Sequence, residues 1–386
     1  MLILDGEYIS PLLLKTIKGN NIPKLIINNF TERYPSVSSM EEDQYINFLK
    51  NEKKMFVNSE KCLSLLYEYL PGNSLTFIAD SFKNKAKFRL KLKDMYPNFQ
   101  FGEFSLLHFE KYFDDIDIQF PIIIKPIKGY SSVGVYKIDN YEQLKSSLSD
   151  IKESLKDISK IYHRDILNTN KFMFESYIFG TEFAIDGYFN NEGKPIVLNI
   201  FKRLFKNNSD TADGIYYTSL SVIEEIYNYV LEFMEKLQQQ YNLKNFPLHF
   251  ELRKNNSGVV PIEVNPYRFA GIGTNELGEY AFGINAYKYF IYNLEPDWEE
   301  VKRKIGDSIF SFYCAEVPLS TYFQDYSIDH SLFKKQFNNI LEYRKINIED
   351  DRTFAIVFYE GENEDENSRL INFDINSVLK IKVGIK

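Results

Sequence analysis

Cysteine, histidine and tryptophan are scarce in this chain of 386 residues, which contains two cysteines, four histidines and one tryptophan. Cys62 and Cys314 lie far apart and lack metal-ligand spacing, so neither a disulfide framework nor a cysteine-based zinc site is expected. The sequence instead indicates a reducing, cytoplasmic setting with two buried, inert thiols.

Long apolar runs and an excess of positive charge are also missing. No run approaches the roughly 20 apolar residues of a membrane helix, and Met1–Asp5 lacks the basic region of a signal peptide. The net charge is −8 and the pI is about 5.3, whereas nucleic-acid-binding proteins present a basic face. We therefore expect neither a membrane nor a nucleic acid as partner.

The first 80 residues alternate between short apolar runs and helical patterns, which is typical of a small parallel β/α domain. They contain no Gly-x-Gly-x-x-Gly motif, so a dinucleotide site there is unsupported. A helix is expected between the first two strands, over Pro11–Lys18. The predicted strands are Leu2–Leu4, Leu25–Ile27, Phe56–Val57 and Leu75–Ile78.

Strands and helices continue to about residue 294 and indicate an α/β (α+β) fold. The segment Lys83–Tyr96 predicts one basic helix, most of whose lysines should form a solvated face. Phe120–Lys125 predicts a buried strand, and Val222–Gln240 predicts a long helix. Beyond residue 295 the pattern weakens and carries no motif.

Two carboxylates and an amide lie on a predicted hairpin. Glu251 precedes the turn Asn255–Gly258, and Glu263 and Asn265 follow it. Because side chains alternate along a strand, all three can point to one face of the hairpin. Three oxygen ligands suit Mg²⁺, which prefers carboxylates together with phosphate oxygens and water. The hairpin therefore indicates nucleotide-triphosphate chemistry.

A glycine-containing loop after a buried strand is a candidate phosphate site. Lys125 ends the strand with a positive charge, and Gly129, Ser131, Ser132 and Gly134 lie in the loop. The glycines allow backbone N–H groups to approach an anion, and the serines add donors. For this loop alone, an ordinary glycine turn between two strands is the better interpretation.

A second carboxylate pair, Glu175 and Glu182, brackets a break between two predicted strands. Backbone groups that are free at strand ends can contact an adenine edge, and a carboxylate can accept hydrogen bonds from ribose hydroxyls. Exposed carboxylates at strand ends explain the pair equally well when it is taken alone.

Together and in this order, these blocks resemble the ATP-grasp superfamily over residues 80–290. The resemblance implies a β/α domain over 1–80, an ATP-grasp domain over 81–294 with a lid subdomain over 115–180, and a C-terminal region over 295–386. That last region would complete the module, cover the site or mediate dimerisation. The matching blocks are Asn84–Lys85, Pro121–Pro126, Gly129–Gly134, Glu175–Glu182, His249–Glu251 and Glu263–Pro266.

The resemblance also implies a role for each block. The lysines would contact nucleotide phosphates, the glycine loop would close over them, Glu175 with backbone groups of Ser176 and Ile178 would hold adenine, and Glu182 would hold the ribose. The implied ligands of Mg²⁺, with Mn²⁺ as a second candidate ion, are Glu251, Glu263 and Asn265. The implied ATP-binding residues are Lys85, Lys125, Gly129, Ser131, Ser132, Gly134, Glu175, Ser176, Ile178 and Glu182.

One departure from the family pattern concerns the catalytic arginine. The family commonly has an arginine soon after the metal-binding asparagine, and here Tyr267 intervenes, so that Arg268 comes one place later. Arg268 is the first candidate for the catalytic arginine. Arg253 is the second, because it shares the Glu251 face of its strand by period two. His249 lies on that face too, although a lone histidine is more often structural than a substrate contact.

Substrate contacts are predicted in two loops. Lys202 and Arg203 could clamp a substrate carboxylate, and a solvated basic turn is an equal alternative. Gly271 opens the segment Gly271–Asn275, which could line an acceptor site or could simply precede a helix.

The resemblance implies that ATP activates a carboxylate as an acyl phosphate, that ADP is released, and that an amine then attacks. We expect a ligase for a small-molecule carboxylate and an amine, with amino acids or short peptides favoured. A phosphotransferase and a non-catalytic nucleotide sensor remain alternatives, and carboxylation is less favoured. A homodimer is expected by analogy alone.

Overall fold

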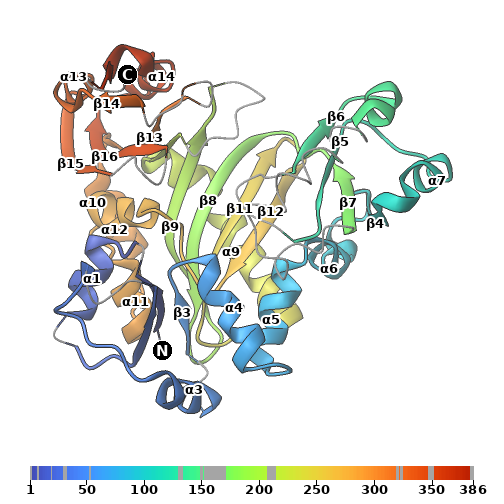
Figure 1. The fold of residues 1–386 in the computed structure, drawn as a ribbon, viewed down its shortest axis with the longest axis horizontal. Coiled ribbons are helices and arrows are strands. Elements are labelled where there is room, and N and C mark those ends of the chain that lie inside the picture. Colours follow the sequence, from blue (N-terminus) through green and yellow to red (C-terminus); the bar gives the residue numbers. More distant parts are fainter. Residues whose placement is uncertain are drawn as a thin grey trace. The chain divides into compact units, whose positions relative to one another are not determined.

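Two compact units divide the chain (Figure 1). The first contains Met1–Cys62, Thr181–Glu251 and Tyr267–Lys386, and the second contains Leu63–Gly180 and Leu252–Pro266. The computed structural model describes residues 2–382 apart from 7, 19, 29–32, 52–53, 129–133, 148–150, 152–170, 207–213, 319–320, 322–324 and 347–351.

A small parallel sheet opens the first unit. Its strand order is β2-β1-β3, and β1 pairs in parallel with both neighbours. Ser10 begins helix α1 by accepting a hydrogen bond from the Leu13 amide, and Pro11 occupies the first turn. The predicted small parallel β/α fold is therefore confirmed. Its elements are β1 Leu2–Asp5, α1 Pro11–Ile17, β2 Lys24–Ile27, α3 Glu42–Asn51 and β3 Phe56–Val57.

A large sheet forms the centre of the first unit. Its strand order is β12-β11-β8-β9-β10-β13-β16-β15, in which β12 belongs to the second unit and β11 crosses from one unit to the other. Helix α9 packs against β9 through apolar residues that recur at helical spacing, among them Ile226, Val230 and Phe233. The elements are β8 Thr181–Phe189, β9 Pro195–Leu204, β10 Ile215–Thr218, α9 Leu220–Tyr241, β11 Phe246–Asn255 and β12 Gly258–Pro266.

The region after residue 295 contributes three antiparallel strands, β13, β16 and β15, to this sheet. Its buried core includes Tyr313, Phe333, Phe354 and Tyr359. Sequence left three roles open for this region, and in the structure it extends the large sheet. The elements from residue 274 on are η3 Thr274–Glu276, α10 Leu277–Phe282, α11 Ala286–Tyr292, α12 Trp298–Ile305, β13 Ile309–Glu316, β14 Tyr326–Ile328, α13 His330–Lys334, β15 Asn339–Lys345, β16 Thr353–Gly361, α14 Asp365–Ile371, η5 Ile375–Val378 and β17 Leu379–Ile381.

The second unit contains a four-stranded antiparallel sheet of order β4-β7-β5-β6. Its core is rich in aromatic residues, and Phe104, Phe113 and Phe174 belong to one buried cluster with Ile124. The elements are α4 Glu60–Tyr69, α5 Ser74–Lys83, α6 Lys85–Lys91, η1 Lys93–Met95, β4 Phe101–Ser105, η2 Leu106–His108, α7 Phe109–Asp114, β5 Ile122–Pro126, β6 Tyr136–Ile138 and β7 Lys171–Ser176.

Two predictions about local structure are wrong. The apolar run Leu75–Ile78 is part of helix α5 and not a strand, because Asn73 caps a helix there by accepting from the Leu75 amide. Short apolar runs do not distinguish the two structures by periodicity. The basic segment Lys83–Tyr96 is not one helix, since the Asn84 side chain accepts from the Lys87 amide and starts α6 anew.

The length and polarity of the helices bear on whether one of them could span a membrane. The longest helix in the described part of the chain, α9, has 22 residues and carries charged side chains along its length. Among the described residues, no helix is long and apolar enough to cross a membrane.

Candidate functional site

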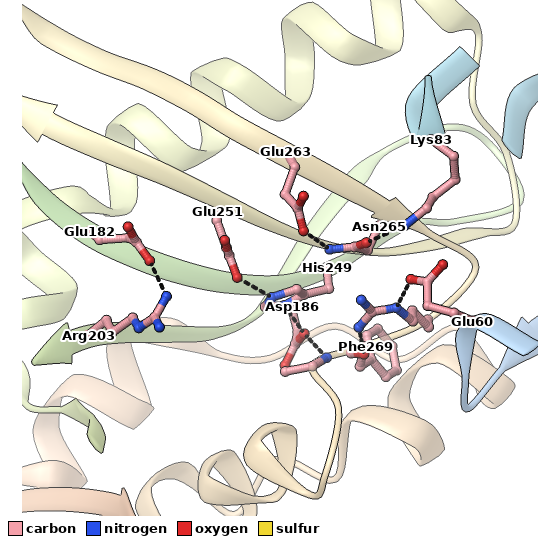
Figure 2. Close-up of polar contacts among 12 residues, drawn as sticks. Glu60, Lys83, Glu182, Asp186, Arg203, His249, Glu251, Glu263, Asn265 and Phe269 are labelled. Carbon is pink, nitrogen blue, oxygen red and sulfur yellow. Dashed lines mark hydrogen bonds and ion pairs between the residues drawn. The ribbon is translucent and has the colours of Figure 1, made fainter. Parts of the chain in front are cut away.

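Glu263 and Asn265 form a polar pair at the end of β12 in the second unit. They are two residues apart, so strand alternation places them on one face, and the Asn265 amide Nδ2 donates to Glu263 Oε1 at 2.9 Å. Lys83 Nζ donates to Asn265 Oδ1 at 3.1 Å, and Lys85 Nζ lies 3.8 Å from Glu263 Oε2. Figure 2 shows Lys83 and Glu263 on either side of Asn265. The side-chain oxygens of Glu263 and Asn265 thus lie beside two positive charges.

The charge state of Glu263 follows from these neighbours. Partial burial raises its pKa, but Lys85, Lys83 and the Asn265 amide outweigh burial and hold the pKa at about 2. Glu263 is therefore an anion at neutral pH. The carboxylate can bind a cation, and the two neighbouring ammonium groups can bind phosphate oxygens that accompany it.

The three predicted metal ligands are divided between the two units. Glu263 and Asn265 belong to the second unit, whereas Glu251 belongs to the first. Over the described ranges, no group of three His, Cys, Asp or Glu side chains is arranged to hold a metal ion, and the predicted set has only two carboxylates. The joint site of Glu251, Glu263 and Asn265 stays a prediction.

Lys83 is a residue that sequence analysis missed. The pattern assigned it to a solvated face, but it is the last residue of α5 and its ammonium contacts Asn265. Its position directly before the capping Asn84 was the available signal, since a helix that ends there turns its last residue toward β12, against which α5 packs.

A buried ion triad lies at the centre of the second unit. Arg89 Nε donates to Glu175 Oε2 at 2.6 Å, and Lys125 Nζ donates to Glu175 Oε1 at 2.5 Å. Arg89 also donates to the carbonyl oxygens of Pro261 and Ile262 at 2.7 and 3.2 Å. Helix α6, strands β5 and β7, and strand β12 are thereby joined by one set of charge-assisted hydrogen bonds.

The triad fixes the charge of Glu175 and bears on the predicted nucleotide contacts of Glu175 and Lys125. Burial raises the pKa of Glu175, but Arg89 and Lys125 lower it to about 2, so the carboxylate stays ionised. Sequence analysis missed Arg89 because it lies in a lysine-rich run, yet only 3% of it is exposed. The adenine role of Glu175 and the phosphate role of Lys125 stay predictions, since each side chain is occupied by the other.

The segment that follows β7 is fixed by its backbone. The Ser176 amide donates to the Gln100 carbonyl at 2.8 Å. The Ile178 carbonyl accepts from Arg253 Nη1 at 2.8 Å. Arg253, a candidate catalytic residue, therefore contacts the segment predicted to hold adenine. At Gly180, where φ is +119°, an added Cβ would collide with the Lys254 carbonyl oxygen, so the close approach requires glycine.

In the first unit, Asp186 is the centre of a buried network on β8 (Figure 2). Its Oδ1 accepts from the Ala270 amide at 2.7 Å and lies 3.0 Å from His249 Nδ1. Its Oδ2 accepts from the Asn199 amide Nδ2 at 2.9 Å. His249 Nε2 lies 3.7 Å from Glu251 Oε1. Sequence analysis did not single out Asp186, whose strand gave no motif signal.

This network determines the protonation state of the His249 imidazole. Burial lowers the pKa of the imidazole, but Asp186 and Glu251 outweigh it and raise the pKa to about 9. His249 is thus a cation at neutral pH, held between two carboxylates. It positions Glu251, the predicted ligand at the end of the first unit's part of β11.

Asp186→Asn should lower the free energy of unfolding by about 2 kcal/mol, because buried donors lose a charged acceptor. It should also move the His249 pKa down from about 9, since the anion that stabilises the imidazolium is gone. Urea unfolding and an NMR titration in EDTA measure the two effects. Exposed Asp307→Asn is the matched control. An unchanged His249 titration would show that Asp186 does not set its charge.

Glu182 and Arg203 form a further ion pair on β8 and β9. Arg203 Nη1 donates to Glu182 Oε1 at 2.8 Å, and 4% of the Glu182 side chain is exposed. Lys202 Nζ lies 3.8 Å from Glu225 Oε2. The equal alternative of a solvated basic turn therefore does not describe Arg203. The ribose role of Glu182 and the substrate roles of Lys202 and Arg203 stay predictions.

Arg268 lies after an unusual backbone conformation. Tyr267 is buried with φ of +62°, which is uncommon for a residue other than glycine. Strand alternation therefore ends at Pro266. Arg268 Nε donates to Glu60 Oε1 at 3.0 Å, and its Nη1 donates to the Phe269 carbonyl. Arg268 is anchored within the first unit, and its catalytic role stays a prediction.

The remaining predicted residues lie in loops. Gly129, Ser131 and Ser132 fall outside the described residues. Gly134 is described with φ of +73°, in the left-handed region that favours glycine. Gly271 is exposed, and an added Cβ would have no neighbouring atom within 4 Å.

Comparison with known proteins identifies a matching domain family and similar folds. Residues 118–276 match the family described as ATP-grasp domain. No curated protein matches the chain in sequence. The fold is similar to that of an L-amino acid ligase from Bacillus licheniformis, with a TM-score of 0.66 and 17% identity, covering 99% of this chain and 98% of that one.

Two further structures are similar at the same level. One is N5-carboxyaminoimidazole ribonucleotide synthetase from Thermotoga maritima, with a TM-score of 0.64, 11% identity and 98% of each chain covered. The other is phosphoribosylglycinamide synthetase from Anaerococcus prevotii, with a TM-score of 0.60, 14% identity, and 99% of this chain and 98% of that one covered. At these identities the likeness establishes the fold and leaves the reaction open.

Proposed function

The chain carries an ATP-grasp domain, and from this premise we propose that the protein is an ATP-dependent, ADP-forming ligase that joins a small carboxylate to an amine. The observation that carries the proposal is the group on β12, where Glu263 and Asn265 present oxygens beside the ammonium groups of Lys83 and Lys85. A polyanionic nucleotide and its metal ion need both kinds of group within one site.

The donor set fits magnesium. The Glu263 carboxylate, with a pKa of about 2, and the Asn265 amide oxygen are hard oxygen ligands. The amide oxygen already accepts a hydrogen bond from a positive charge, the Lys83 ammonium. We assign Glu263 and Asn265 as ligands and keep Glu251 as the predicted third. When bound, the ion would neutralise negative charge on the transferred phosphoryl group. Lys83 and Lys85 would then turn to the phosphate oxygens.

The proposed reaction has two steps. A carboxylate oxygen of the first substrate attacks the γ-phosphorus of ATP, the bond from that phosphorus to the ADP oxygen breaks, and an acyl phosphate forms. The amine nitrogen of the second substrate then attacks the acyl carbon, phosphate leaves, and the nitrogen loses a proton. Both reactants of the first step are anions, so the lysines lower the barrier by neutralising charge.

Nucleotide release tests the proposal. Purified protein with Mg²⁺ and ATP is incubated with pooled amino acids and small carboxylates, with pooled amines, and with both, and ADP and AMP are resolved. A ligase gives ADP at a sustained rate only when a carboxylate and an amine are both present. ADP together with a stable phosphorylated product and no amine would identify a phosphotransferase, and AMP would contradict acyl-phosphate chemistry.

A further inference from the structure

One guanidinium in the second unit bonds both to the strand that carries Glu263 and to the four-stranded sheet. Arg89 Nη1 and Nη2 donate to the carbonyl oxygens of Pro261 and Ile262 at 2.7 and 3.2 Å. Ile262 directly precedes Glu263 in the chain. Arg89 Nε donates to Glu175 Oε2 on β7 at 2.6 Å. Three N–H groups of one side chain therefore join the backbone of β12 to the four-stranded sheet.

The helix that carries Arg89 also carries a lysine of the proposed site. Lys85 and Arg89 are four residues apart on α6, so they lie on one face of the helix. Lys85 Nζ lies 3.8 Å from Glu263 Oε2, and its side chain is 13% exposed. Lys87, between the two, is 59% exposed and pairs with Asp80 instead. One face of α6 thus places Lys85 beside the Glu263 carboxylate and Arg89 beside the backbone that precedes it.

Strand β12 depends on such bonds more than the inner strands do. It is the last strand in the order of the large sheet, and in the described part of the chain only β11 pairs with it in that sheet. Arg89 is 3% exposed, and its guanidinium carbon lies 4.6 Å from the centre of the Phe99 ring. A buried guanidinium with directed N–H groups fixes the orientation of its acceptors as well as their charge.

We propose that Arg89 is a positioning residue that fixes Glu263 relative to Lys85 for the joint binding of a metal ion and nucleotide phosphate, an inference that rests on the proposed function. In this role Arg89 acts through the carbonyl groups of β12 and touches neither the ion nor the phosphate. Replacing a group that orients a metal ligand typically lowers metal affinity or activity by about 10- to 100-fold.

A purely electrostatic role for Arg89 is the alternative, and two variants separate it from positioning. Arg89→Lys keeps the positive charge beside Glu175, but one ammonium does not reproduce three directed bonds of a planar guanidinium. Arg89→Gln removes the charge and leaves Glu175 with Lys125 as a balanced buried pair, so no buried charge loses its partner. Positioning predicts the same defect in both variants, whereas an electrostatic role predicts a defect in Arg89→Gln alone.

Calorimetric titration with ADP at a series of Mg²⁺ concentrations and in EDTA tests the inference. We expect Mg²⁺ to strengthen ADP binding by the unmodified protein. In both Arg89 variants, the Mg²⁺ concentration that gives half of this effect should rise by about 10- to 100-fold. In EDTA, where Glu263 has no metal ion to bind, the affinity for ADP should change far less. Arg303→Lys, at an exposed arginine on α12, is the matched control and should leave both properties unchanged.

A general loosening of the second unit would give a different result. Circular dichroism establishes that each variant is folded before it is titrated. An equal loss of ADP affinity at every Mg²⁺ concentration and in EDTA would indicate a structural role alone and would overturn the inference. A defect confined to Arg89→Gln, or an unchanged Mg²⁺ dependence in both variants, would overturn it as well.

The same data separate the inference from the proposed function. A shifted Mg²⁺ dependence in both variants, without ADP formation from ATP by any pair of substrates, would retain the positioning role and reject the ligase. Ligase activity of the unmodified protein, with an unchanged Mg²⁺ dependence in the variants, would retain the ligase and reject the positioning role. Absence of ADP binding by the unmodified protein would reject both.

Discussion

Glu263→Gln should lower the rate of ADP formation by on the order of 100- to 1,000-fold, the range found when one preorganised electrostatic contact is removed from an active site. The substitution keeps the shape and the hydrogen bond from Asn265 and removes the negative charge. A neutral amide is a weaker metal ligand, and Lys85 loses its counter-charge. Initial rates at saturating ATP and limiting Mg²⁺ measure the effect.

The control for this variant is Glu232→Gln, which removes an exposed carboxylate paired with Lys236 on α9 and should leave the rate unchanged. Excess Mg²⁺ should restore part of the lost Glu263→Gln activity if the defect lies in metal affinity. Turnover equal to that of the unmodified protein at limiting Mg²⁺ would remove Glu263 from the metal site.

Glu175→Gln should lower the free energy of unfolding by about 3 kcal/mol, because it leaves two buried cations, Arg89 and Lys125, without their carboxylate. The effect depends on pH. The pKa of Glu175 is about 2 in the folded protein, below its ordinary value of 4.5, so its stabilisation is present above pH 4.5 and is lost as the pH falls towards 2.

Urea unfolding followed by circular dichroism measures this loss, and hydrogen–deuterium exchange of β5 and β7 locates it in the second unit. Glu103→Gln on neighbouring β4 is the matched control, because its ion pair with Lys171 is 39% and 52% exposed and such pairs contribute little. A Glu175→Gln protein as stable as the control at neutral pH would show that the triad does not stabilise the unit.

Local sequence pattern predicted the fold and the placement of two candidate site residues on one strand face. The period of two along a strand placed Glu263 and Asn265 on one face, and the structure shows them hydrogen-bonded to each other. The parallel sheet of the first 57 residues followed from alternating apolar runs. In both cases the residues concerned lie close together in the sequence or recur with the regular period of a strand.

Contacts between distant residues were not predictable in this way. Lys83 and Asn265 are 182 positions apart, and Arg89 and Glu175 are 86 apart. Nothing in a lysine-rich helix distinguishes the buried Arg89 from its solvated neighbours. Asp186 looked like an ordinary strand residue because its partners, His249 and Ala270, meet it only through the tertiary fold.

Backbone conformation was a second source of error. The left-handed φ of Tyr267 ends the strand pattern, so the direction of Arg268 could not be inferred by alternation. Asn73 and Asn84 cap two successive helices, which sequence analysis had taken as a strand and one long helix. A single capping side chain determines where such a helix begins, and the periodicity of apolar residues does not reveal it.

Isotope transfer tests the acyl-phosphate reaction most directly. Amino acids labelled with the heavy oxygen isotope in their carboxylates are incubated with the protein, ATP and Mg²⁺, and the released phosphate is analysed by mass spectrometry. We predict one labelled oxygen in the phosphate for each ADP formed, because the attacking carboxylate oxygen leaves with the phosphoryl group. Unlabelled phosphate alongside ligated product, or label found in AMP, would contradict it.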